Sequence, residues 1–225
     1  MFFSLVATTK IRNLYIIGTS HIAKQSEQDI EHLIRKKKPQ AIALELDRGR
    51  YHTLLHPQTS TTSIAKISLL GGMLKSLQDR ISRAAGTEAG IEMKAAIQLA
   101  RQQKIPIYCI DQDVRITLKR TMRAMSWREK IRLCKNMFFM DKKSLQISLN
   151  LEKVPSKNLL TQVMQEFHQQ YPGMYQVLVE ERNQYMAKNL YNLMRKYKGT
   201  VLAVVGAGHQ QGIAQRITWY LQKER

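Results

Sequence analysis

The sequence contains little cysteine. Only two cysteines occur among 225 residues, Cys109 and Cys134, and neither has a partner at the spacing of metal ligands. A disulfide framework and a cysteine-based metal site are therefore excluded. This cysteine usage is typical of a reducing compartment, so we expect a cytoplasmic protein.

Long hydrophobic runs are also missing. No stretch approaches the roughly 18–20 uninterrupted apolar residues of a membrane-spanning helix. The apolar beginning, residues 1–7, is short, and the basic residues Lys10 and Arg12 follow it, whereas a secretory signal begins with its basic residues. Because 44% of the residues are hydrophobic and 24% are charged, the chain can bury a proper core. We expect one domain over residues 1–225.

Acidic residues are scarce relative to basic ones. The 17 aspartates and glutamates are outnumbered by 36 lysines and arginines, which gives a net charge of +19 and an isoelectric point near 10.1. Such a surface attracts nucleic acid, anionic lipid and acidic ligands. The excess is concentrated in residues 115–157, where twelve basic residues accompany three acidic ones.

Within this basic segment, an apolar stripe at helical spacing is flanked by basic residues, as in a helix at a membrane interface. One hypothesis is that the segment docks on a nucleic acid or on an anionic membrane. The alternative, which we favour from the sequence, is that the stripe packs into the protein while the charges are solvated. The stripe consists of Trp127, Ile131, Cys134 and Phe138, and its flanks of Arg128, Lys130, Arg132 and Lys135.

Four short runs rich in isoleucine, leucine and valine predict β-strands. They are apolar without alternation, as expected for strands of a parallel sheet that is covered on both faces. The runs occupy residues 14–18, 41–46, 105–110 and 201–206.

Helices are expected between these strands. A helix over residues 26–38, capped by Ser26, connects the first two strands, and further helices are expected over residues 63–83 and 87–103. The long segment 114–198 has helical periodicity and no convincing strand. The prediction is an α/β fold with a mainly parallel central sheet flanked by helices. A large helical insertion, or cap, separates the third strand from the last.

Acids and histidines follow the ends of all four expected strands. The carboxyl ends of parallel strands meet at one edge, where ligands of open α/β sheets bind, so we expect one cleft. Imidazole nitrogens and carboxylate oxygens bind divalent transition metals, which activate water for hydrolysis. Metal-assisted hydrolysis is the resulting hypothesis. The residues are His21, Glu45, Asp47, Asp111, Asp113 and His209.

Both of these histidines lie in glycine-containing motifs, Gly18-Thr19-Ser20-His21 and Gly206-Ala207-Gly208-His209. The alternative to a metal site is that each histidine is a hydrogen-bonded structural residue. The glycines then serve only the turns, with Gly208 at a positive φ.

Other charged residues leave similar alternatives open. Glu92 and Glu181, on expected helices, either point into the cleft or are solvated. Arginines bind carboxylates and phosphates through two parallel hydrogen bonds, so four of them are candidate substrate ligands. They are Arg48, Arg115, Arg120 and Arg182, whereas His32, His52, His56 and His168 are expected at the surface.

Six motifs together resemble the TraB/PrgY family, in the family's order from near residue 14 to near residue 214. They are the two glycine-histidine motifs, the last followed by Gly212-Ile213; Ala43-Leu44-Glu45-Leu46-Asp47 with Arg48 and Tyr51; Glu92-Met93-Lys94-Ala95-Ala96; Asp111 with Ile116-Thr117-Leu118-Lys119-Arg120; and Glu181-Arg182-Asn183 with Tyr185-Met186-Ala187. The resemblance implies a wider group that includes the Tiki metal-dependent proteases and the ChaN-like and erythromycin-esterase-like proteins. TraB and PrgY themselves are associated with pheromone shutdown.

By position, the resemblance implies an active site of His21, Glu45, Arg182 and His209, with further family positions at Glu92, Asp111 and Arg120. One departure is Gln112, because related sequences commonly have arginine directly after the strand-three aspartate; Arg115 is a candidate substitute.

The sequence and the resemblance lead us to expect a divalent-metal hydrolase that cleaves a peptide. His21 and His209 would bind manganese, cobalt or zinc, and Glu45 would act as a ligand or a general base. Arg182 and Arg120 would hold a substrate carboxylate or stabilise an oxyanion. A non-catalytic protein that binds a peptide or a small anionic ligand is the alternative, and a homo-oligomer is compatible with either.

Overall fold

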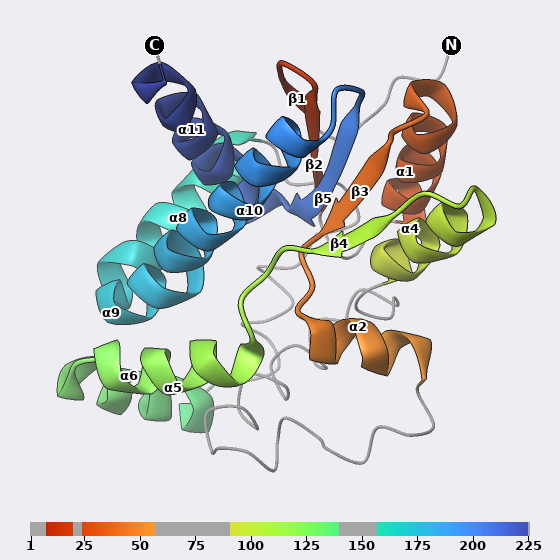
Figure 1. Ribbon diagram of the computed structural model, residues 1–225. Helices are drawn as coiled ribbons and strands as arrows, with labels where there is room; N and C mark the ends of the chain where they lie inside the picture. Colours follow the sequence, from red (N-terminus) through yellow and green to blue (C-terminus); the bar gives the residue numbers. More distant parts are fainter. Residues whose placement is uncertain (1–7, 20–23, 57–90, 140–156, 225) are drawn as a thin grey trace.

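The computed structural model describes residues 8–19, 24–56, 91–139 and 157–224. They form a five-stranded sheet with helices on both faces (Figure 1). The strands are β1 (Thr8–Ile11), β2 (Leu14–Thr19), β3 (Ala41–Leu44), β4 (Ile107–Cys109) and β5 (Val201–Gly206).

The sheet has the strand order β1-β2-β5-β3-β4, so the last strand of the chain lies in the middle. Strands β2, β5, β3 and β4 are parallel, and β5 is buried along its whole length. Strand β2 pairs with β5 from Leu14 opposite Val201 to Thr19 opposite Gly206. The two glycine-histidine motifs of the sequence therefore begin on neighbouring strands.

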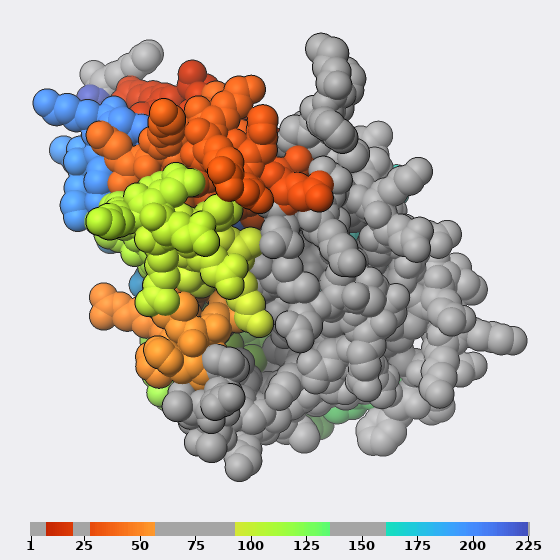
Figure 2. All heavy atoms as spheres, turned by 90° about the vertical axis from the view of Figure 1, so that its right-hand side faces the viewer, coloured from red at the N-terminus to blue at the C-terminus, as the bar shows by residue number. Residues whose placement is uncertain are grey.

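Two helical layers bury the two faces of this sheet. On one face, α1 (Lys24–Lys37) and α4 (Ile91–Gln102) pack on β2, β3 and β5 through a fully buried cluster that contains Ile30, Ile34 and Ile97. Figure 2 shows these two helices side by side on that surface. On the other face, α10 (Arg182–Lys196) and α11 (Ala207–Lys223) complete a second cluster around Met186, Leu190 and Ile213.

The described residues between β4 and β5 form a series of helices joined by short connections. It contains α5 (Val114–Ala124), α6 (Trp127–Phe139), α8 (Lys157–Gln170), α9 (Pro172–Tyr175) and the π-helix η3 (Gln176–Glu181), which leads directly into α10. The predicted α/β fold with a parallel sheet and a large helical insertion is thus confirmed.

Several local predictions need correction. The first helix begins at Lys24, so Ser26 lies inside its first turn and does not cap it. The strands expected over 41–46 and 105–110 are shorter, because β3 ends at Leu44 and β4 extends only from Ile107 to Cys109. Strand β1 and the short helix α2 (Arg48–Leu55) were not expected. The helix expected over 63–83 lies outside the described residues, as does the beginning of the one expected over 87–103.

Across the described part of the chain, every helix is too short or too polar to cross a bilayer.

Candidate functional site

Arg182 is the centre of a polar cluster at the carboxyl edge of the sheet. It is the first residue of α10, and its guanidinium donates to Asp111 Oδ1 from Nε at 3.0 Å and to Asp111 Oδ2 from Nη2 at 2.8 Å. Nη2 also donates to Glu45 Oε1 at 2.5 Å. The guanidinium therefore joins the segments that follow β3 and β4.

The remaining N–H groups of Arg182 are also used. Nη1 donates to the carbonyl oxygen of Leu178, four residues earlier in η3, at 3.1 Å, and lies 3.0 Å from Nε2 of His209. A guanidinium has five N–H donors and no acceptor. Each of the five thus has an acceptor here, so Arg182 is fixed in position.

This contact determines the tautomer of His209. Because Arg182 Nη1 carries only donors, His209 Nε2 must accept, and the ring proton is then on Nδ1. Nδ1 donates to Asn183 Oδ1 at 2.8 Å. We therefore assign a neutral His209 whose Nε2 lone pair faces the cluster, 3.4 Å from Glu45 Oε1.

The two carboxylates are positioned by backbone hydrogen bonds just beyond the strands. The N–H of Glu45 donates to Val204 O at 3.0 Å, and the N–H of Asp111 donates to Leu46 O at 3.2 Å. Glu45 Oε2 accepts from the N–H of Gly206 at 2.6 Å, at the beginning of α11, where the helix dipole favours negative charge. The side chains of Glu45 and Asp111 are 6% and 4% exposed, so both charges are buried.

Within the described part of this cluster, the guanidinium of Arg182 pairs with two carboxylates, those of Glu45 and Asp111. Burial alone would lower the pKa of Arg182, but the charges of Glu45 and Asp111 and the hydrogen bonds to them raise this pKa above its ordinary value. The guanidinium is therefore charged and pairs with both carboxylates.

Two glycines make room for the amide side chains that support the cluster. A Cβ at Gly212 would lie 2.3 Å from Asn183 Nδ2, the amide that positions His209. A Cβ at Gly18 would lie 2.6 Å from Gln210 Oε1. The amide nitrogen of Gln210 donates to Thr9 Oγ1 and to the carbonyl oxygen of Ile16. These glycines therefore permit close packing of side chains.

The expectation of a positive φ at Gly208 is wrong, because Gly208 lies within α11 and its φ is not positive. Asn183 and Gln210 were not expected as supporting residues. The sequence signal that could have identified them is their position, because Asn183 directly follows Arg182 and Gln210 directly follows His209.

The other arginines proposed from the sequence lie in other pairs. Arg120 donates to both oxygens of Glu181, at 2.7 and 2.9 Å, and joins α5 to η3. Arg115 pairs with Asp113, which accepts from the Arg115 N–H at the beginning of α5. Arg48 is the exposed first residue of α2. None of these three is joined to the Arg182 cluster by a described hydrogen bond.

Two further aspartates serve as helix caps. Asp47 accepts from the N–H of Arg50 at 2.9 Å and caps α2, whereas Asp113 caps α5. The N–H of Gln112 donates to Asp111 Oδ1 at 2.8 Å, so the position that departs from the family pattern contributes a backbone donor. Arg115 does not replace the missing arginine at Asp111, because it pairs with Asp113.

Two of the remaining candidate site residues cannot be placed. His21 and the side chain of Glu92 lie outside the described residues. Among the described residues, no three histidine, cysteine, aspartate or glutamate side chains are grouped to hold a metal ion. The histidines expected at the surface are exposed: His32, His52, His56 and His168.

The sheet and this cluster define an α/β protein with a buried arginine, carboxylate and histidine group at the carboxyl edge of parallel strands, where such folds bind ligands. The chain belongs to the TraB/PrgY/gumN family, which it matches over residues 4–223.

Two kinds of relative illustrate this membership. The protein MJ1365 of Methanocaldococcus jannaschii is 34% identical over 221 residues, which cover 94% of this chain and 54% of that protein. TraB domain-containing proteins of Homo sapiens and Mus musculus are 26% identical over 235 residues, which cover 89% of this chain and 61% of theirs. The chain thus spans little more than half the length of the curated relatives it matches.

Proposed function

We propose that this protein is a metal-dependent hydrolase, with peptides as its substrate class. The observation that carries the proposal is that two buried carboxylates, an arginine and a histidine meet at the carboxyl edge of the sheet. Arg182 pairs with Glu45 and Asp111, and His209 Nε2 lies 3.4 Å from Glu45 Oε1. A divalent cation is a suitable ligand for this combination of imidazole and carboxylate groups.

The donor chemistry fits such an ion. Imidazole nitrogen with carboxylate oxygen suits manganese, cobalt or zinc, and these donors alone do not select among the three. His209 and Glu45 would hold the ion together with His21, and the ion would take the place of the Arg182 N–H at His209 Nε2. Strand β2 runs beside β5, and Thr19 is opposite Gly206, so both motifs leave the sheet at the same edge. When bound, the ion supplies Lewis acidity and activates water.

The protein groups would then have distinct roles. Glu45 would be a ligand or a general base, since its Oε1 is next to the histidine nitrogen that binds the ion. Arg182 would hold Glu45 and Asp111 in place, because its five N–H groups all have acceptors within the protein. A substrate carboxylate would be attracted by the net charge of +19 before it reaches the site.

The experiment is peptide cleavage by purified protein with added Mn²⁺, Co²⁺ or Zn²⁺, followed by mass spectrometry of a peptide library. Cleavage is expected to require at least one of these ions and to be abolished by His21→Ala and by His209→Ala. The control is His56→Ala, which removes an exposed histidine on the C-terminal side of α2. Cleavage that survives both site substitutions would overturn the proposal.

Elemental analysis tests the metal separately from turnover. Wild-type protein and His56→Ala are expected to retain the ion, whereas the His21→Ala/His209→Ala double variant is expected to lose it. Equal metal content in all three would remove the metal site, whatever the outcome with peptides.

A second candidate is a non-catalytic protein that binds a peptide or a small anionic ligand. The saturated hydrogen bonding of Arg182 favours it, because a fixed cluster is suited to a structural role under a binding cleft. Calorimetry with peptides that are recovered intact would favour this candidate, and release of fragments would exclude it.

A further inference from the structure

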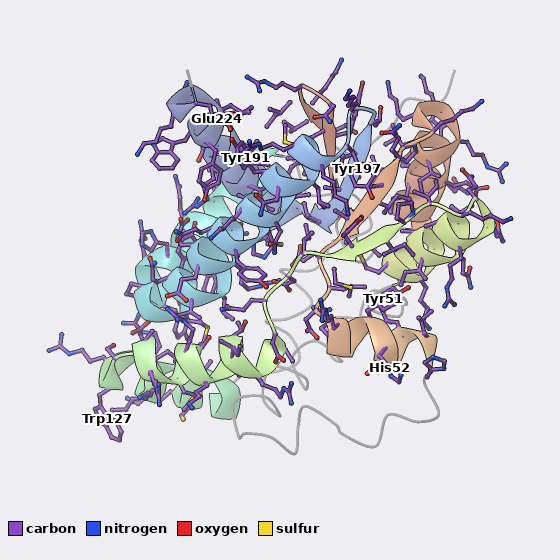
Figure 3. All side chains as sticks on the ribbon, viewed as in Figure 1. Tyr51, His52, Trp127, Tyr191, Tyr197 and Glu224 are labelled. Carbon is purple, nitrogen blue, oxygen red and sulfur yellow. The ribbon has the colours of Figure 1, made fainter. Side chains whose placement is uncertain are left out.

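Helix α6 presents two different faces. Its inner face contains Glu129 and Leu133, and Glu129 is 4% exposed. Its outer face contains Trp127 and Ile131, which are 75% and 41% exposed. Figure 3 shows Trp127 pointing away from the body of the protein. The sequence expectation that this apolar stripe is buried is therefore wrong for these two side chains.

Helix α5, which precedes α6, adds apolar side chains to the same end of the molecule (Figure 1). Ile116 is 50% exposed and Met122 is 39% exposed. We call the exposed residues of α5 and α6, within residues 114–135, the α5-α6 surface. Its four large apolar side chains are Ile116, Met122, Trp127 and Ile131.

The charges of the α5-α6 surface have one sign. Residues 114–135 contain eight basic residues and a single acid, Glu129, which is buried. Two of the eight, Arg115 and Arg120, pair with Asp113 and Glu181. The other six are Lys119, Arg123, Arg128, Lys130, Arg132 and Lys135. The surface thus combines uncompensated positive charge with exposed apolar groups.

We propose that the α5-α6 surface docks on an anionic lipid bilayer. Trp127 and Ile131 enter the headgroup region, where tryptophan is favoured, and the flanking lysines and arginines contact lipid phosphates and carboxylates. Nucleic acid also attracts this charge, but its backbone contacts are polar and do not require exposed isoleucine and methionine. The apolar side chains therefore favour lipid.

Docking would also orient the Arg182 cluster. Helix α5 begins directly after the segment that contains Asp111 and contacts η3, which leads into Arg182. A bilayer bound at the α5-α6 surface would therefore lie on the side of the molecule that contains the carboxyl ends of the parallel strands.

The experiment compares vesicles of phosphatidylcholine with and without phosphatidylserine. The protein is expected to sediment only with vesicles that contain phosphatidylserine. The double variant Trp127→Ala/Ile131→Ala should bind them about tenfold more weakly or worse, because both apolar groups are lost. The matched control is Trp219→Ala, which removes a 50% exposed tryptophan from α11 and is expected to bind as wild type.

Fluorescence gives a second measurement. The chain has two tryptophans, so in Trp219→Phe the emission comes from Trp127 alone. Phosphatidylserine vesicles are expected to shift this emission to shorter wavelength, and neutral vesicles are expected to leave it unchanged.

Three results would overturn the proposal. The first is vesicle binding that the double variant retains in full. The second is binding to duplex DNA as tight as to vesicles, with no emission shift on vesicles, which indicates nonspecific attraction to polyanions. The third is an emission shift that depends on protein concentration without vesicles, which identifies the surface as a contact between two copies of this chain.

Discussion

At the scale of single residues, Arg182 has the largest expected effect, because two buried carboxylates depend on it. Arg182→Ala would remove the guanidinium that pairs with both buried carboxylates, and breaking a buried ion pair in this way typically costs about 3–5 kcal/mol. The matched change is Arg120→Ala, whose pair with Glu181 is exposed on the arginine side, so solvent screens it and its loss is expected to cost much less. Urea unfolding of the two variants measures the difference. Equal losses of stability would contradict the central role of Arg182.

Two glycines of α11 allow a second test at this scale. Gly212→Ala would place Cβ 2.3 Å from Asn183 Nδ2, so the amide must move and His209 loses its Nδ1 acceptor. We expect a loss of about 1–3 kcal/mol from this overpacking. Gly208→Ala meets only the flexible end of Met164, at 3.4 Å or more, and as a better helix former it should stabilise by up to about 1 kcal/mol.

Thermal unfolding gives the stabilities of these two variants, and NMR of the imidazole reports its tautomer. The Nδ1-protonated form of His209 is expected in the wild type and in both variants, because Arg182 Nη1 still requires Nε2 to accept. The Nδ1 proton resonance is expected to shift only in Gly212→Ala, where Asn183 Oδ1 no longer accepts from it. An unshifted resonance in Gly212→Ala would show that Asn183 does not hold the ring.

At the scale of elements, Glu129 joins two helices of the insertion. It forms a capping box with Ser126 at the beginning of α6, with Ser126 N donating to Glu129 Oε2 at 2.6 Å and Glu129 N donating to Ser126 Oγ at 3.3 Å. Its other oxygen accepts from the N–H groups of Gly173, at 2.8 Å, and Met174, at 3.3 Å, in α9. Burial raises the pKa of Glu129, but these donors lower it more, so it lies below its ordinary value.

This pKa predicts how stability depends on pH. Because the folded pKa of Glu129 is depressed, its stabilising contribution is present above the unfolded pKa and is lost as pH falls through the folded pKa. Glu129→Gln is expected to cost about 1–3 kcal/mol at neutral pH and progressively less as the solution is acidified. The exposed Glu166→Gln on α8 is the control. A difference between wild type and Glu129→Gln that is constant from neutral to acidic pH would contradict this role.

The strands and the residues at their ends show how much of the fold could be predicted from the sequence. The apolar runs located β2, β3, β4 and β5, because short runs rich in isoleucine, leucine and valine are recognisable without their partners. This holds even for β4, which is half-buried at the edge of the sheet. Strand β1 was missed because its residues Thr8, Thr9 and Lys10 are polar. They form a strand through antiparallel pairing with β2, which no apolar pattern indicates. Asp47 and Asp113 resembled site acids because a helix cap and a ligand both follow a strand end.

At the scale of the whole molecule, the cluster combines residues that are remote in sequence. Residues 45, 111, 182 and 209 meet only because β5 enters the sheet between β2 and β3. The sequence placed three of them at strand ends, and the resemblance added Arg182. No local pattern indicates which arginine reaches the carboxylates, since Arg115 and Arg120 have equally suitable composition and pair elsewhere.

This connectivity predicts that a ligand of the cluster stabilises the entire fold. If His209 binds the proposed metal, Mn²⁺ or Zn²⁺ at one hundred times its dissociation constant contributes about 2.7 kcal/mol to the free energy of unfolding. For a chain of this size that corresponds to a rise in Tm of roughly 5–10 °C. Calorimetry should show this rise in wild type and in His56→Ala. His209→Ala should not show it, since the ion then lacks one of its two proposed imidazole ligands. A rise that is equal in all three proteins would mean that the metal binds elsewhere and that the cluster is held together by Arg182 alone.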